Sequence, residues 1–137
     1  MNQNFMKCGL IGWAMELALS SVHDLTEKKD RRMIGRTSLL MFPIYGMGAL
    51  FCPLAARLRG RSLWERGCIY TGLIFFVEYA TGWLLRKFSM CPWDYSKARF
   101  NIHGLIRLDF APAWFLLGLL FEHCTCKKET CKEADAK

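Results

Sequence analysis

Charged residues are almost absent from four long apolar stretches of this sequence. The stretches hold 73 of the 137 residues but only four charged side chains, whereas the other 64 residues carry 27 charges. Each helix of a water-soluble bundle keeps a polar face along its length, so this segregation argues against a soluble fold. The stretches comprise residues 8–22, 38–56, 67–85 and 102–121.

The lengths of these stretches fit helices that cross a membrane. About 20 apolar residues span the roughly 30 Å hydrocarbon core of a bilayer, and the last three stretches contain 19 or 20 residues. The first is long enough when it begins near residue 5, with Lys7 extending to the headgroups. We therefore predict an all-α fold, a four-helix transmembrane bundle formed by residues 1–122, followed by a polar, Cys-containing tail at 123–137. The predicted spans are 5–22, 38–56, 67–85 and 102–121.

The beginning of the chain has two interpretations. Lys7 supplies a weak basic start and Ala18-Leu19-Ser20 loosely fits a cleavage site, as in a signal peptide. Glu16 interrupts the short apolar run, however, and this favours a helix that is retained in the mature protein.

The basic composition agrees with a membrane location. The sequence has 19 Lys and Arg against 12 Asp and Glu, and its net charge is +7. The basic residues cluster just outside the apolar stretches, where they meet anionic headgroups and influence orientation. We therefore expect contact with the lipid bilayer and none with nucleic acid.

Proline and glycine mark two of the predicted spans. The second span contains Pro43, Gly46, Gly48 and Pro53. Proline removes a backbone donor and kinks a helix, so this span should be bent or broken. Pro112 predicts a kink in the fourth span.

An aromatic segment, residues 91–96, joins the third and fourth spans. Trp93 and Tyr95 suit the headgroup level, where an amphipathic ring keeps one polar edge in water. Asp94 and Ser96 can cap a turn or a short helix. We predict an interfacial loop anchored by these four residues.

One face of the first span carries only small and polar residues. Gly9, Gly12, Glu16 and Ser20 recur at helical spacing. Small residues allow helices to approach closely in lipid, so this face should contact another segment of the chain.

The few polar residues inside the spans are predicted to form a cluster. At a rise of 1.5 Å per residue, the charged ones lie about 7 to 11 Å inside the same membrane boundary. Arg107 and Asp109 are two residues apart, so an ideal helix would point them in different directions. Either the fourth span is distorted there, or the two serve different neighbours. The predicted intramembrane polar cluster comprises Glu16, Tyr45, Glu78, Arg107 and Asp109.

The charge of this cluster leaves several interpretations open. Three carboxylates and one Arg sum to −2, so a carboxylate takes up a proton or a cation or metal ion binds there. The cluster could be a proton or cation relay, a polar substrate pocket, or a metal-dependent active site with His103 nearby. The structural alternative is an Arg–carboxylate brace that orients the bundle. We predict no other cofactor.

The sequence contains seven cysteines, and three of them lie in the tail. Thiolate and imidazole ligands there could hold zinc or copper(I), although their spacing fits no strong zinc signature. Juxtamembrane cysteines can also be acylated, but a reduced, unstructured tail is the favoured prediction. The candidate metal ligands are His123, Cys124, Cys126 and Cys131.

Several motifs of the sequence resemble a known family, the bacterial type IV ABC-transporter permeases (CmpB-like). The resemblance covers about residues 9 to 122 and rests on Gly12-Trp13 with Glu16, and on residues 42–46, 78–82, 91–96 and 104–106. Residues 58–61 and 91–96 are also similar to the animal transmembrane protein 229 family. The resemblance implies a small multi-pass protein of the bacterial inner membrane, and it implies no catalytic residues.

Three hypotheses about function follow. The protein could be a permease component of a transport system, in which the carboxylates handle a cation or proton. The sequence has no Gly-x-x-x-x-Gly-Lys-Ser/Thr motif, so an ABC-type permease would need an ATPase subunit as partner, and self-association to form a homo-oligomer is expected. Alternatively, it could be a membrane-embedded enzyme acting on a lipid-like substrate, or a structural or regulatory membrane subunit.

Overall fold

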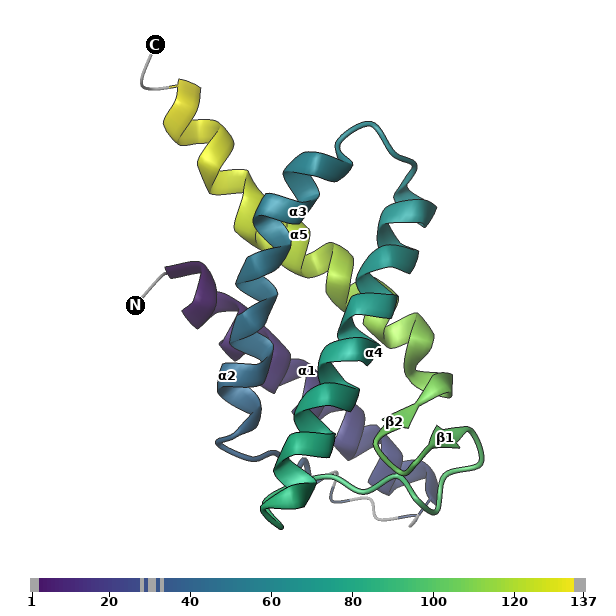
Figure 1. Ribbon diagram of the computed structural model, residues 1–137. Coiled ribbons are helices and arrows are strands. Elements are labelled where there is room, and N and C mark those ends of the chain that lie inside the picture. The colour runs from purple at the N-terminus through teal and green to yellow at the C-terminus, as the bar shows by residue number, and fades with distance from the viewer. Residues whose placement is uncertain (1–2, 28, 30–31, 33, 135–137) are drawn as a thin grey trace. The chain divides into compact units, whose positions relative to one another are not determined.

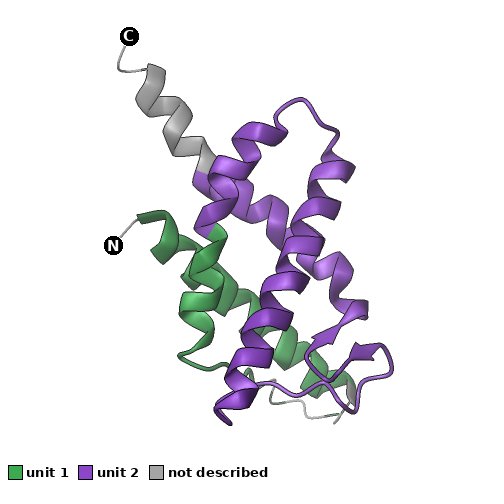
Figure 2. Cartoon of the chain, viewed as in Figure 1, with its two compact units in different colours: residues 1–48 green, residues 49–137 purple. Residues whose placement is uncertain are grey.

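The computed structural model describes the backbone of residues 3–134 except 28, 30, 31 and 33, and side chains as far as Thr125 (Figure 1). The described chain is mainly helical, with one two-stranded sheet. It divides into two compact units, residues 1–48 and 49–137 (Figure 2), and each is described by itself.

Unit 1 is a helical hairpin in which α1 packs against α2. The predicted small face of α1 makes this contact. A Cβ atom added to Gly9 would lie 2.7 Å from the Phe42 ring, and one added to Gly12 would lie 2.1 Å from Cγ of Tyr45. The absence of side chains at these glycines therefore allows two aromatic rings to lie on the backbone of α1. The bounds are Gln3–Glu27 for α1 and Met41–Gly46 for α2.

The connection between α1 and α2 returns along the same face of α1. The Trp13 indole N–H donates to the carbonyl of Ser38 at 3.1 Å, and the backbone N–H of Arg36 donates to Oγ of Ser20 at 2.9 Å. Polar side chains of α1 thus form hydrogen bonds with backbone groups of the connection. Without such partners, burying these groups in an apolar environment would cost free energy.

The predicted break in the second span is confirmed. The α2 helix is followed by a short 3₁₀ helix, η1 (Met47–Leu50), and then by α3 (Phe51–Leu58). Pro43 is the third residue of α2, where a backbone N–H has no intrahelical acceptor and its loss costs little. Pro53 is the third residue of α3, just after the helical path changes from 3₁₀ to α.

In unit 2, α5 packs against both α3 and α4. The Phe51 ring of α3 stacks on Tyr70 of α4 with centroids 5.0 Å apart, and it meets Phe121 of α5 edge-on at 6.1 Å. The α4 helix begins with a capping box in which Ser62 and Glu65 exchange side chain to backbone hydrogen bonds. The bounds are Leu63–Lys87 for α4 and Ala111–Ala134 for α5.

The predicted fourth span requires correction. Residues 101–110 do not form an α-helix: they form an antiparallel pair of short strands, in which Asn101 pairs with Arg107, and then a 3₁₀ helix. His103 and Gly104 reverse the chain with φ angles of +52° and +68°, which are incompatible with a right-handed helix. The elements are β1 (Asn101–Ile102), β2 (Ile106–Arg107) and η2 (Leu108–Phe110).

The helix that was expected from residue 102 begins instead at Ala111 and continues to Ala134. Pro112 is its second residue, so it starts the helix and does not kink it. The backbone of residues 123–134, which were predicted to form an unstructured tail, belongs to α5.

The exposed faces of the helices are apolar. Every fourth residue of α4 from Trp64 to Leu84 is exposed, and none of these six residues is charged. The opposite face holds the buried residues, Glu78 among them. Three helical stretches of the described chain are long and apolar enough to cross a membrane: Gln3–Thr26, Met41–Leu58 and Leu63–Lys87. The predicted helical membrane fold is confirmed in this respect.

Candidate functional site

The residues of the predicted polar cluster are distributed over both units. Glu16 and Tyr45 belong to unit 1, whereas Glu78, Arg107 and Asp109 belong to unit 2. Their surroundings are therefore described unit by unit.

In unit 1, Glu16 is held by the connection that returns along α1. The Thr37 hydroxyl donates to Oε2 of Glu16 at 3.0 Å. Tyr45 is buried, with 9% of its surface exposed, and its ring lies on Gly12, one helical turn before Glu16. The carboxylate of Glu16, within the apolar part of α1, thus accepts a hydrogen bond from its own hairpin, which reduces the cost of removing it from water.

In unit 2, Glu78 is the buried carboxylate of α4. Only 8% of its surface is exposed, and the indole N–H of Trp114 donates to its Oε2 atom at 3.2 Å. Trp114 belongs to the first turn of α5 and is itself 4% exposed. This hydrogen bond connects two helices at a position that lipid or protein shields from water.

Arg107 and Asp109 form an ion pair with each other. The guanidinium Nε donates to Oδ1 of Asp109 at 2.8 Å, and its Nη2 lies 2.7 Å from Oδ2. Arg107 has extended φ and ψ angles of −134° and 108°, and Asp109 lies in the 3₁₀ helix that follows it, so the two side chains do not project from one α-helix. The sequence-based depth of both residues assumes a helix from residue 102, and this assumption is wrong.

Aromatic rings connect this ion pair to Trp114. The Arg107 guanidinium lies 4.8 Å from the centroid of the Phe110 ring, and Phe110 meets Trp114 edge-on at 5.7 Å. Tyr95 of the predicted interfacial segment contacts the same Phe110 ring edge-on at 5.9 Å. In unit 2, aromatic side chains therefore form a continuous group that extends from the ion pair to Trp114.

The segment of residues 91–96 folds onto α4 and the β1–β2 hairpin. The Trp93 indole N–H donates to the carbonyl of Leu105 at 2.9 Å, and a Cβ atom on Gly82 would lie 2.9 Å from Cζ2 of Trp93. Segments of α4, the loop and the hairpin thus meet around one indole ring.

Asp94 and Ser96 close a turn within this segment. Oδ1 of Asp94 accepts hydrogen bonds from the hydroxyl and the backbone N–H of Ser96, the latter at 3.0 Å. These bonds, with smaller contributions from the nearby charges of Arg86 and Lys97, hold the pKa of the exposed Asp94 carboxyl below its ordinary value. A Cβ atom on Gly104 would lie 2.4 Å from Oγ of Ser96, so this turn and the hairpin fit closely.

Sequence reasoning missed an ion pair between α4 and α5. Nη1 of Arg66 contacts Oε1 of Glu122, and the two side chains are 24% and 16% exposed. The residues are 56 positions apart, and each lies just outside a predicted span. Only the packing of α4 on α5 brings them together.

The candidate metal ligands of the tail are only partly described. His123 is exposed and Cys124 is half-buried, whereas the side chains of Cys126 and Cys131 lie outside the described residues. Among the side chains that the structure describes, no group of three or more His, Cys, Asp or Glu residues is placed to hold a metal ion.

The apolar exposed faces and the inward-facing carboxylate define a membrane protein. Residues 3–130 match the family described as "Putative ABC-transporter type IV", and the chain belongs to this family. No solved structure matches the chain. The similarity to the transmembrane protein 229 family stays an expectation from the sequence.

Proposed function

We propose that this protein is a multi-pass permease subunit of an ABC-type transporter in the bacterial inner membrane. The family supports a transport role, and three helical stretches can cross the bilayer. The observation that carries the proposal further is the buried Glu78, which accepts a hydrogen bond from Trp114 inside the helical layer.

A carboxylate within a membrane helix is costly, so its presence suggests a function. Placing an ionised Asp at the centre of a membrane helix costs about 2.5 to 3.5 kcal/mol on insertion scales, and such residues commonly mark ion or substrate pathways. Glu78 is therefore suited to bind and release a proton or a cation during transport.

Glu16 is the second candidate for this role. It also projects from a membrane-spanning helix and accepts a hydrogen bond, from Thr37. Arg107 and Asp109 neutralise each other as a pair, so we assign them a structural role: they brace the segment that leads into α5.

Reaction with an apolar carbodiimide tests the role of Glu78. Dicyclohexylcarbodiimide partitions into membranes and forms a covalent adduct with protonated carboxyl groups. We expect a mass increase on the peptide that contains Glu78, absent in Glu78→Gln and retained in Glu65→Gln, which removes the exposed carboxylate of the α4 capping box. Lack of an adduct at Glu78 between pH 5 and pH 8 would contradict proton binding there.

The proposed subunit role requires an ATPase encoded outside these 137 residues, because the sequence has no phosphate-binding loop motif. We expect a chain with that motif to co-purify with the tagged protein from mild detergent, together with ATP hydrolysis. An unrelated multi-pass protein of the same membrane, carrying the same tag, serves as the control. If chemical cross-linking in native membranes captures no ATPase chain either, the permease assignment is wrong.

A further inference from the structure

Two exposed tryptophans of α4 mark the levels of the membrane surfaces. Trp64 is 74% exposed and Trp83 is 50% exposed, and 19 residues of helix separate them by about 28 Å. This separation matches the roughly 30 Å hydrocarbon core, and Trp is enriched at both of its boundaries. Arg86 and Lys87, which follow Trp83, therefore lie at the level of the lipid headgroups.

An unusual histidine lies next to this end of α4. His103 has a φ angle of +52°, in the left-handed region that few residues other than glycine adopt. Its ring is exposed, and Nδ1 lies 3.0 Å from the hydroxyl oxygen of Tyr79. Strained residues cluster at binding and catalytic sites, so a strained, exposed side chain held by a hydrogen bond suggests a role for its ring.

The Tyr79 hydroxyl determines what the ring can do. When this hydroxyl donates to Nδ1 of His103, the proton of the neutral imidazole lies on Nε2, which then acts as a donor. Tyr79 belongs to α4, two turns before Arg86 on the same face of the helix. The hydrogen bond thus fixes the imidazole ring beside the face of α4 that ends in Arg86.

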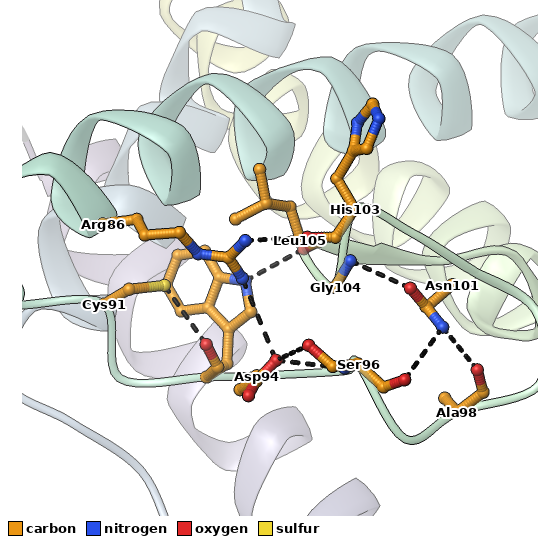
Figure 3. A network of polar contacts seen from close by, with 10 residues as sticks. Arg86, Cys91, Asp94, Ser96, Ala98, Asn101, His103, Gly104 and Leu105 are labelled. Carbon is orange, nitrogen blue, oxygen red and sulfur yellow. Dashed lines mark hydrogen bonds and ion pairs between the residues drawn. The ribbon is translucent and has the colours of Figure 1, made fainter.

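The Arg86 side chain connects α4 to the same turn. Its Nη1 donates to the carbonyl of His103 at 2.8 Å, and its Nη2 lies 3.9 Å from Oδ1 of Asp94 (Figure 3). The guanidinium retains exposed surface, because 45% of the side chain is accessible. Lys87 follows Arg86 in the sequence, and its amino group lies 3.8 Å from the centroid of the Trp83 ring.

We propose that His103, Arg86 and Lys87 bind the phosphate group of an anionic phospholipid at this end of α4. An imidazole N–H, a guanidinium and an ammonium group supply donors and positive charge for phosphate oxygens. Asp94 contributes the opposing charge at this site, and Lys97 and Arg99 of the adjoining loop keep the surface basic. The position next to an interfacial tryptophan identifies a membrane lipid, and not a soluble phosphate compound, as the ligand.

Retention of lipid by the purified full-length protein tests the site. Native mass spectrometry from detergent micelles would compare the binding of phosphatidylglycerol and phosphatidylcholine. His103→Asn removes the ring but retains a residue that tolerates a positive φ angle, and Arg86→Gln removes one charge. Arg61→Gln removes one exposed charge at the opposite end of α4 and serves as the control.

We expect Arg86→Gln to weaken binding of phosphatidylglycerol about tenfold or more, as for the loss of one hydrogen bond to a charged phosphate oxygen. His103→Asn should weaken it about threefold, as for the loss of one hydrogen bond, without lowering the unfolding temperature. Arg61→Gln should have no effect. Wild-type binding by both site variants, or an equal loss in Arg61→Gln, would overturn the proposal. Displacement of the lipid by millimolar inorganic phosphate would overturn the choice of a lipid as the ligand.

Discussion

Replacing Trp114 by Ala is expected to destabilise unit 2 by about 3 kcal/mol. The side chain is 4% exposed, contacts Phe110 and donates to the buried Glu78. Lipid tails are as apolar as the protein interior, so the loss would come from packing and from the carboxylate that loses its donor. Unfolding in mixed micelles by increasing SDS, followed by circular dichroism, would measure it.

A smaller substitution at the same position isolates the hydrogen bond. Trp114→Phe keeps an aromatic ring but removes the N–H, and the expected loss is about 1 to 3 kcal/mol. In the Glu78→Gln background the same substitution should cost less, because a neutral amide is a weaker acceptor than a carboxylate. Trp64→Phe, at an exposed position of α4, is the control. Equal costs in both backgrounds would show that the two side chains are not coupled.

Two glycine substitutions are expected to differ in their effect on stability. Gly12→Ala should cost about 2 to 3 kcal/mol, because its Cβ would lie 2.1 Å from Cγ and 2.4 Å from Cβ of Tyr45. These atoms are next to the Tyr45 backbone and cannot move away without shifting α2. Gly72→Ala, with nothing within 4 Å of the added Cβ, should be neutral or stabilise α4 by up to about 1 kcal/mol.

The same SDS titration would compare the two glycine variants. A difference in their midpoints would confirm that the close approach of α2 to α1 depends on a missing side chain. If Gly12→Ala were as stable as the wild type, the contact between α1 and Tyr45 would be looser than the structure has it.

The comparison of Glu78 with Arg107 shows where reasoning from the sequence succeeds and fails. Glu78 lies within 25 residues of continuous helix, so its periodicity and its neighbours place it on the buried face. Arg107 lies in an apolar stretch of similar hydropathy, but the backbone there is extended. Because hydropathy measures burial and not backbone conformation, it treats a buried hairpin and a helix alike. Leu105 and Ile106, which are 2% and 8% exposed, are buried in the hairpin region.

Local signals for the hairpin were present in the sequence. The Asn101 side chain accepts a hydrogen bond from the backbone N–H of Gly104 at 2.9 Å, and Asn followed shortly by Gly is typical of turns. Proline, here Pro112, is more common in the first turn of a helix than in its middle. Together they would have placed the start of α5 after the turn, near its observed position at Ala111.

By itself, the sequence determined that this protein lies in a membrane, and it located the three helical stretches that are long and apolar enough to cross one. These properties follow from the cost of charge in lipid, which depends on residue type and spacing along one helix. Only the tertiary structure decided that Trp114 is a partner of Glu78, that Arg107 pairs with Asp109, and that Trp93 lies on Gly82. Such partners depend on how separate segments pack and on the backbone conformation between them, and the spacing of residues along one helix does not specify either.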